Sequence, residues 1–599
     1  MEDQLLKYYE RELTFIREMG AEFARKYPKI AGRLLLEGDK CEDPHTERLI
    51  EAFALISGRI HKKIDDDFPE ITESLLNIIY PHYINPIPSM SIVQFEPIRQ
   101  NIPEGGYRID RHTSLFSKPV KGAACRFRTT QAVHILPLEV AAAGLTEPKR
   151  LTKGAVQVIE LEIKTFNAIS LSKINWSALR FFLNGPYQHV FHLYELLFNH
   201  VSHIECEADG GRGGKTVLEL PPSAVQAVGF DESQGMLPYA ARSFPGYLLL
   251  FEYFSFPEKF LFFDLAGLKG LLDAGQLGDA LTLRIYLNRM TKADVVVNAD
   301  TFCLNAAPVV NLFERITEPI RVEHRKSEYQ VIPDIRRQDS TEVYTVDQVI
   351  ATTSGAGQID YKPFYSMRHH LGEIGKESQV FWHIQRRPSE RSEDHGTDVY
   401  LSFSDLNLKP TDPGEDILTV RATCTNRDLP SRLPFGDAAG DLNLESAAPV
   451  AKITCIIKPT NTRRPFLGGV LQWRLISHLS LNYMSLVQDG EHALREMLRL
   501  YNFDNSLSSQ QQINGIVAVD TKHVTKRVGN SFCRGVCVTI TFDEDKYVGA
   551  GLYLFASVLE HFLAQYVSVN SFSQLVAKTI QREEPVKTWA PRSGKQVLL

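Results

Sequence analysis

Four histidines lie close together in the sequence, at His189, His192, His200 and His203. Each of the two pairs is spaced by three residues, so each pair could present its imidazoles on one helix face, where their nitrogens could bind zinc. No Asp, Glu or Cys completes a known zinc-ligand spacing around them. Histidines that face solvent or are satisfied within a core are the alternative. We predict no metal site here, although the sequence alone leaves the metal open.

Residues 210–216 read GGRGGKT and end like a phosphate-binding loop. Such a loop requires a glycine five residues before Gly214, where this chain has Asp209, and it must open a helix. Here the strand-like run VLEL follows and stops at a proline. The sequence therefore favours the flexible tip of a β-hairpin.

Acidic and nucleophilic patterns give little support for catalysis. Asp65, Asp66 and Asp67 could chelate a hard cation, but a solvated helix end beside two lysines explains them as well. The chain has no G-x-S-x-G, H-E-x-x-H or complete G-x-G-x-x-G motif. Paired carboxylates for glycoside hydrolysis can be far apart in sequence, so a β-rich hydrolase stays open as an alternative. We predict no catalytic, cofactor-binding or metal-binding residue.

Basic residues gather only in short stretches, at 385–391 and 458–465. Neither stretch has the interleaved aromatic residues of a nucleic-acid stacking platform. The formal net charge of −6 also argues against nucleic acid or an anionic membrane surface as a partner. We interpret both stretches as solvated loops, with an acidic protein partner as the alternative.

The length of 599 residues predicts roughly three to five domains. Hydrophobic residues make up 43% and charged residues 23%, which is typical of a globular chain. Eight cysteines are dispersed, and the closest pair, Cys533-x3-Cys537, lacks a zinc-knuckle spacing. The amino-terminal residues lack the basic and apolar regions of a signal peptide, and no apolar run is long enough to span a bilayer. These features predict a cytosolic protein with reduced cysteines.

The elements that would hold functional residues begin with helices. Apolar residues recur in steps of three and four, which predicts a helix over about 5–27, at Leu5, Tyr9, Leu13, Ile16, Met19, Phe23 and Tyr27. Leu6, Tyr8 and Phe15 widen this apolar arc to about half the circumference. Glu12 projects into the arc and needs a partner or an opening to water.

Further elements divide the rest of the chain. Helices are expected at about 44–64, from Pro69 to before Pro81, near 187–198, and at 468–484, 490–502 and 548–568. Short strands dominate from about 90 to 460, with polar, mobile loops at 386–398 and 429–443. The fold class is α+β multidomain: a helical amino-terminal region (1–88), β-rich domains (89–300 and 301–465) and an α/β carboxy-terminal domain (466–599).

The main physical feature of this chain, which has no recognisable catalytic motif, is more apolar helix surface than a simple surface helix carries. The first helix is more apolar than a simple surface helix, and the helix at 548–568 is apolar on nearly all sides. A partner subunit is one way to bury such surface. The pattern therefore favours an obligate assembly subunit over a free monomer.

Several long, distinctive stretches extend over nearly the whole chain, apart from 338–450, and lie at 8–34, 43–95, 251–265, 308–320, 328–334, 473–486 and 549–575. Together they resemble the TssF family of type VI secretion baseplate subunits. None matches a general catalytic motif. The resemblance implies a non-enzymatic, cytoplasmic building block of a contractile injection machine, in a baseplate docked at the inner membrane complex. A wedge protein of a phage-derived contractile particle is the alternative with the same fold.

The resemblance also implies partners. Two copies of the chain are expected to join one TssG-type subunit in a wedge. That wedge would contact the TssE-type sheath initiator, TssK-type trimers and the spike hub, and would meet the membrane only indirectly. We expect the seven apolar residues of helix 5–27 that are named above, from Leu5 to Tyr27, to pack in a helical bundle between subunits. The alternative is that they pack on helix 44–64 of the same chain. Residues 251–265 are expected in the core, where a buried Glu252 or Asp264 would need hydrogen-bonded partners.

Overall fold

The computed structural model has 28% helix and 41% strand, which confirms the β-rich α+β class. It describes residues 2–27, 29, 36–37, 40–41, 43–67, 69–148, 154–174, 178–210, 214–238, 243–272, 277–292, 294–323, 326–353, 357–364, 380–391, 394–405, 417–465, 475, 490–503, 506–528, 531–567 and 571–594. The chain divides into two compact units. The first comprises 1–77 and 466–479, and the second comprises 78–465 and 480–599.

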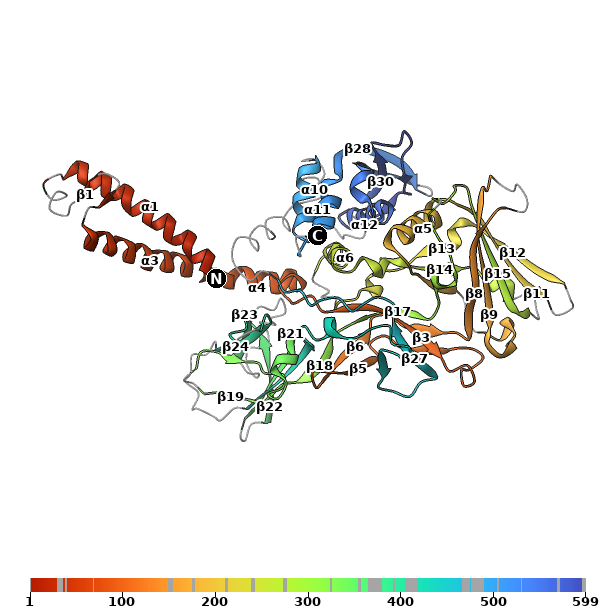
Figure 1. Ribbon diagram of the computed structural model, residues 1–599, viewed down its shortest axis with the longest axis horizontal. Helices are drawn as coiled ribbons and strands as arrows, with labels where there is room; N and C mark the ends of the chain where they lie inside the picture. Colours follow the sequence, from red (N-terminus) through yellow and green to blue (C-terminus); the bar gives the residue numbers. More distant parts are fainter. Residues whose placement is uncertain are drawn as a thin grey trace. The chain divides into compact units, whose positions relative to one another are not determined.

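The first unit is built on a helical hairpin. Helices α1 (Glu2–Lys26) and α3 (Pro44–Asp67) lie antiparallel (Figure 1), and the short strands β1 (Leu36–Glu37) and β2 (Lys40–Cys41) pair between them along the chain. Both helices confirm the sequence prediction. Helix α4 (Pro69–Ile79) starts with proline, which suits a first helical turn, and ends before Pro81 as expected.

A closed barrel forms the centre of the second unit. Its order is β17-β3-β27-β26-β5-β6, and its strands are β3 (Met90–Pro97), β5 (Ser114–Val120), β6 (Ala123–Thr129), β17 (Ala306–Val310), β26 (Leu442–Leu444) and β27 (Val450–Cys455). Val93, Phe95, Phe127, Val309 and Ile453 point into one core. The barrel therefore takes strands from both sides of residue 300.

Three smaller sheets adjoin the barrel along the chain. The first is a two-stranded pair, β4 (Tyr107–Ile109) with β7 (Val133–Ile135). The second has the order β13-β14-β10-β16, with β10 (Ala178–Leu183), β13 (Val225–Ala227), β14 (Phe262–Ala266) and β16 (Phe302–Cys303). The third has the order β12-β11-β15-β9-β8, with β8 (Leu138–Thr146), β9 (Gln157–Thr165), β11 (Val201–Gly210), β12 (Lys215–Leu220) and β15 (Leu277–Leu287). Along the chain, helices α5 (Tyr187–Asn199) and α7 (Lys269–Leu272) lie between strands of the second and third sheets, and α6 (Pro245–Ser255) lies between β13 and β14 of the second.

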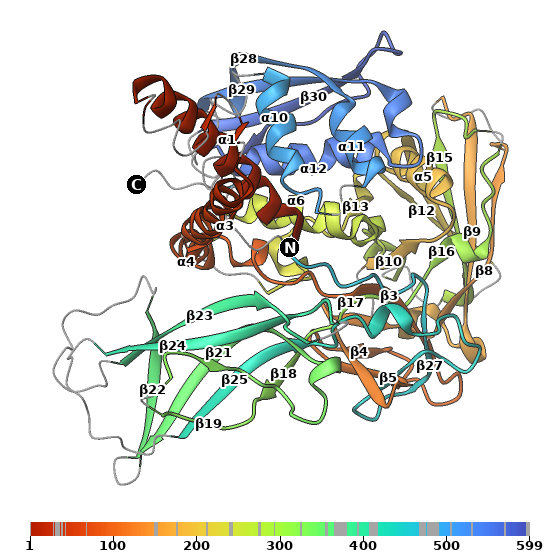
Figure 2. The ribbon, with the colours of Figure 1, turned by 60° about the vertical axis from the view of Figure 1, so that its left-hand side comes forward.

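A mostly antiparallel eight-stranded sheet follows, visible as the green strands of Figure 2. Its strands are β18 (Phe313–Ile316), β19 (Ile320–Arg321), β20 (Tyr329–Gln330), β21 (Glu342–Thr353), β22 (Gly357–Pro363), β23 (Val380–Pro388), β24 (Thr397–Asp405) and β25 (Ile417–Thr425). Its core includes Val349, Leu401 and Val420. Strand β23 covers the first residues of the loop expected at 386–398. The loop expected at 429–443 contains β26 and is tied by Asp441, which accepts backbone hydrogen bonds from Gly436 and Cys455.

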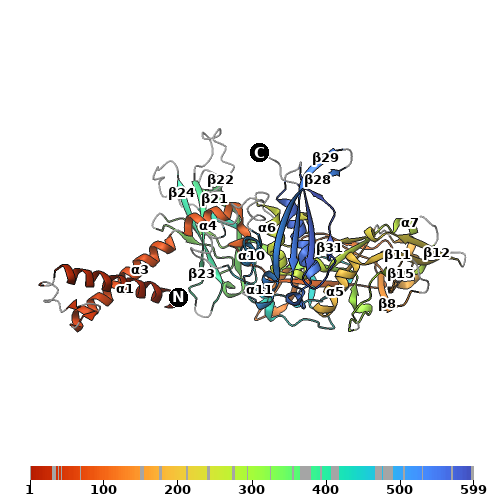
Figure 3. The same cartoon turned by 90° about the horizontal axis from the view of Figure 1, so that it is seen from above.

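The carboxy-terminal part confirms the expected α/β texture. Its elements are α10 (Gly490–Arg499), α11 (Leu507–Asn514), β28 (Ile516–Val528), β29 (Ser531–Phe542), α12 (Leu552–Gln565), β30 (Ser571–Thr579), β31 (Lys587–Thr588) and β32 (Arg592–Ser593). Strands β29 and β30 are parallel, with α12 as the crossover, and Figure 3 views this sheet from above. Helix α12 is buried on nearly all sides and packs on β30 and α6, as its apolar circumference predicts. The helix expected at 468–484 lies outside the described residues, apart from Leu475.

Candidate interaction surface

The seam between α1 and α3 is narrow and partly polar. Ser57 Oγ donates a hydrogen bond to Glu12 Oε2 over 3.0 Å, so the acid predicted to need a partner has one. A Cβ on Gly58 would lie 3.0 Å from the Tyr9 backbone nitrogen, which shows how closely the two helix backbones approach. The Arg17 guanidinium and the Glu47 carboxylate form an ion pair at 2.5 Å at the other end of the seam.

Of the seven predicted partner-contact residues, three are exposed in the described part of the chain, all in or just after the carboxy-terminal half of α1. Met19 is 51% exposed, and Phe23 and Tyr27 are also exposed, with their ring centroids 5.3 Å apart. Tyr9, Leu13 and Ile16 are half-buried, whereas the side chain of Leu5 lies outside the described residues. Phe15, at 58% exposure, extends the row at a spacing of four residues. Intrachain packing on α3 therefore leaves much of this apolar arc open.

Helix α3 presents a second apolar row on one narrow face. Leu49 is 71% and Phe53 64% exposed, and Ile56 and Ile60 continue the row. At 100° per residue these four side chains lie opposite Ala54 and Gly58, the buried residues of the seam. The spacing of this row was visible in the sequence. Its direction was not, because only the small residues of the seam decide which side of α3 meets α1.

The four histidines do not form the pattern that two helical pairs would give. His189 and His192 lie on α5, but His200 is its C-cap and His203 lies on β11. His203 is buried and stacks on the Tyr286 ring at 4.2 Å, so the second helical pair is wrong. Among the described residues, no group of three or more His, Cys, Asp or Glu could hold a metal ion.

The other candidate motifs resolve into local structure. Strands β11 and β12 pair antiparallel up to Asp209 and Lys215, so the GGRGGKT stretch joins two hairpin strands, as expected. Residues 211–213 at its tip lie outside the described residues. Asp65, Asp66 and Asp67 close α3, and their side chains lie outside the described residues as well.

The basic stretches differ from the solvated loops that the sequence suggested. Arg386 is buried and donates hydrogen bonds to the backbone oxygens of Val343, at 2.7 Å, and Tyr344, at 2.8 Å. Arg464 pairs with the buried Glu342 carboxylate at 2.9 Å. Burial would raise the pKa of Glu342, but the charge and hydrogen bonds of Arg464 outweigh burial and lower it. Arg386 therefore ties backbone segments together and Arg464 serves as an internal counter-charge, and sequence reasoning missed the distant partners of both.

The segment 251–265 is in the core as predicted. Glu252 is buried and accepts hydrogen bonds from the backbone nitrogens of Met236, at 2.7 Å, and Leu237, at 3.0 Å, and it pairs with the buried Lys259. Asp264 accepts hydrogen bonds from the Nε of Arg180, at 2.7 Å, and from one of its terminal nitrogens, at 2.8 Å. Both acids have the partners that the sequence analysis required.

No helix in the described part of the chain is long and apolar enough to cross a membrane. The structural features that stand out on the first unit are therefore two rows of exposed apolar side chains on a helical hairpin. Such rows are typical of helices that pack against other helices.

Comparisons with known proteins agree over the whole length. The family model "Type VI secretion system, TssF" matches residues 1–596. The chain is 36% identical to type VI secretion system component TssF1 of Pseudomonas aeruginosa, with all of both chains covered. It is similar to a chain in the cryo-electron microscopy structure of the TssK-TssF-TssG baseplate subcomplex, at 28% identity and a TM-score of 0.73, covering 92% of this chain and 99% of that one. A chain of the type VI secretion baseplate complex, at 24% identity and a TM-score of 0.62, has the same fold and covers 99% of this chain and 100% of that one.

Proposed function

The chain belongs to the TssF family of the type VI secretion system, and we propose that two copies of it assemble with one TssG-type subunit into the baseplate wedge. The observation that supports this most is the pair of exposed apolar rows on α1 and α3. Exposed apolar rows on both helices of one hairpin suit a bundle in which each helix meets a neighbouring helix.

The wedge would act as a scaffold without catalysis. It would contact TssK-type trimers, the TssE-type sheath initiator and the spike hub, and would dock at the inner membrane complex through the baseplate. The solved structure similar to this chain is a complex of TssF with TssK and TssG, which supports the first of these contacts. A β-rich hydrolase would need converging carboxylates. The pocket described below is lined by one carboxylate, Asp264, and Arg180 holds it.

Aspartate substitutions on the hairpin test the bundle. Met19→Asp and Phe53→Asp place a charge on exposed positions of the two rows, so the hairpin itself stays folded. Ile16→Asp and Phe23→Asp probe the same bundle from α1. We expect each variant to lose assembly with a co-expressed TssG-type subunit, because an unpaired charge in a helix interface is strongly unfavourable. Native mass spectrometry would measure the two-to-one complex.

Val296→Asp is the matched control, because Val296 is 67% exposed on the second unit. It should leave assembly unchanged. Circular dichroism would show that every variant keeps its helix content. A Met19→Asp or Phe53→Asp chain that still forms the two-to-one complex at wild-type yield would contradict the bundle role of that row.

A further inference from the structure

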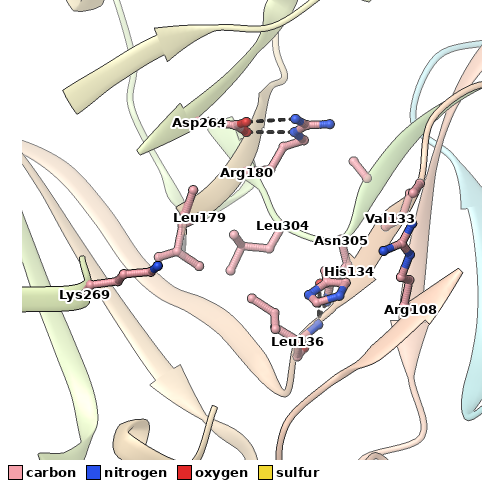
Figure 4. A pocket seen from close by; sticks show the side chains of 13 residues that line it. Arg108, Val133, His134, Leu136, Leu179, Arg180, Asp264, Lys269, Leu304 and Asn305 are labelled. Atoms are coloured by element: carbon pink, nitrogen blue, oxygen red, sulfur yellow. Dashed lines mark hydrogen bonds and ion pairs between the residues drawn. The ribbon is translucent and has the colours of Figure 1, made fainter. Parts of the chain in front are cut away.

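A pocket of about 460 Å³ lies in the second unit, between the β4–β7 pair, strands β10 and β14, and the turn from β16 to β17 (Figure 4). Its inner wall is aliphatic. Leu136, Leu179 and Leu304 are buried and line it, and small alanines from β10 and β17 continue the wall. No Phe, Tyr or Trp lines this pocket, so it offers no platform for stacking a nucleobase.

Cationic and hydrogen-bonding groups surround this aliphatic wall. Figure 4 shows Lys269, Arg180, Arg108 and His134 around the leucines. Arg180 is committed, because it holds Asp264 with two nitrogens and donates a third hydrogen bond to Gln131 at 2.9 Å. The pocket's own carboxylate is therefore neutralised before any ligand arrives.

The ammonium group of Lys269 differs from the Arg180 guanidinium in its partners. Within the described part of the chain, no side-chain hydrogen bond or ion pair is found for Lys269 or His134, and both side chains are exposed to solvent. The Nε of Arg108 donates a hydrogen bond to the exposed Asp110 carboxylate at 3.0 Å. The amide of Asn305 is occupied by the backbone of Leu136, at 2.9 Å from Oδ1 to the nitrogen and 3.2 Å from Nδ2 to the oxygen. A net positive rim above an aliphatic wall results.

We propose that this pocket binds an acidic peptide segment of a neighbouring baseplate subunit. An Asp or Glu carboxylate of that segment would lie against Lys269, with His134 as a further donor, and an adjacent aliphatic side chain would contact Leu179 and Leu304. Charge-assisted hydrogen bonds to a carboxylate give such a contact its orientation. The proposal rests on the baseplate function above, but it concerns a different surface from the hairpin rows.

Lysine footprinting and zero-length crosslinking of the assembled baseplate test the proposal. With sulfo-NHS-acetate as the probe, Lys269 should be acetylated at least tenfold more slowly in the baseplate than in the free chain. Lys118, 57% exposed outside the pocket, is the control and should change less than twofold. A carbodiimide should couple Lys269 to an Asp or Glu of another subunit. Equal acetylation of Lys269 in both states overturns the proposal.

Substitutions then separate this contact from the hairpin. For the subunit that the crosslink identifies, Lys269→Glu should weaken binding at least tenfold, whereas Lys269→Arg should stay within threefold. Lys173→Glu, an exposed position outside the pocket, is the matched control. Unchanged binding by Lys269→Glu overturns the proposal. Protection of Lys269 by vesicles containing phosphatidylglycerol, without other subunits, also overturns it, because the ligand would then be a lipid. Either result leaves the hairpin variants as an independent test of wedge assembly.

Discussion

Replacing Arg464 by alanine should destabilise the second unit through the charge that it leaves behind. Glu342 is buried and keeps only its hydrogen bonds from Thr397, at 2.8 Å from the backbone nitrogen and 2.6 Å from Oγ1, together with the nearby charge of Arg427. Removing one partner of a buried ion pair typically costs about 3–5 kcal/mol. For a unit of this size we expect a decrease in Tm of about 3–5 °C.

The pH dependence of that loss identifies its cause. In the intact chain the pKa of Glu342 is lowered on folding, so its contribution is present above the unfolded pKa of about 4.3 and is lost as pH falls below it. Without Arg464, burial dominates and raises the pKa of Glu342 relative to the wild-type chain. The variant then gains stability from a proton at low pH and loses that contribution as pH rises. The difference in Tm between wild type and Arg464→Ala should therefore be larger at pH 8 than at pH 5.

A double variant completes this test. Adding Glu342→Gln to Arg464→Ala removes the stranded charge and should recover about 1–3 kcal/mol. Differential scanning calorimetry of the full chain at pH 5, 6, 7 and 8 would measure all three proteins. A loss that is the same at every pH, and that Glu342→Gln does not reduce, would refute the reasoning from a buried, uncompensated carboxylate.

Two further perturbations test packing and charge elsewhere. Gly58→Ala should push α1 and α3 apart, because the added Cβ meets backbone at 3.0 Å, and overpacking costs about 1–3 kcal/mol; Gly20→Ala, which has open space within 4 Å, should instead stabilise α1 by up to about 1 kcal/mol. Hydrogen exchange of the α1 amides would measure both, and equal effects would contradict the close approach. Burial would raise the pKa of Glu195, but His200 and Arg582 lower it to about 2, so its contribution is present above about pH 4.3 and is lost toward pH 2. Glu195→Gln should therefore lose less stability than wild type between pH 5 and pH 3 in urea denaturation, and an equal loss would contradict this assignment.

Local patterns predicted the helices well. The apolar steps of three and four gave α1 and α3 within a few residues, and two prolines gave the ends of α4. The apolar circumference of α12 predicted its burial. Glu12 was correctly expected to need a partner, because a carboxylate inside an apolar arc is costly without one. Strand β28 and helix α11 were not predicted. The exposed, mixed composition of β28 hides its period of two, and α11 has only eight residues.

Long-range pairing was beyond the sequence. The residue types around Arg386 and Arg464 are those of a loop, and only the fold brings Val343 and Glu342 to them. For the same reason the pocket around Lys269 was not anticipated, because its lining comes from five separate stretches of chain. The α1 residues were identified as a candidate contact from their periodicity together with the resemblance to the TssF family. Their role between subunits stays a prediction, as do the three boundaries between the four predicted domains.

The barrel constrains the order in which the chain can fold. Strand β3 pairs on one side with β27, which leaves the ribosome roughly 350 residues later, about 20–70 s at typical rates of synthesis. Until then the apolar side chains of Val93 and Phe95 have no complete ring around them. During synthesis, the barrel therefore stays incomplete and its apolar interior stays exposed until the strands between β3 and β27 have been made. We therefore expect a chaperone to bind the nascent chain before residue 450 emerges from the ribosome.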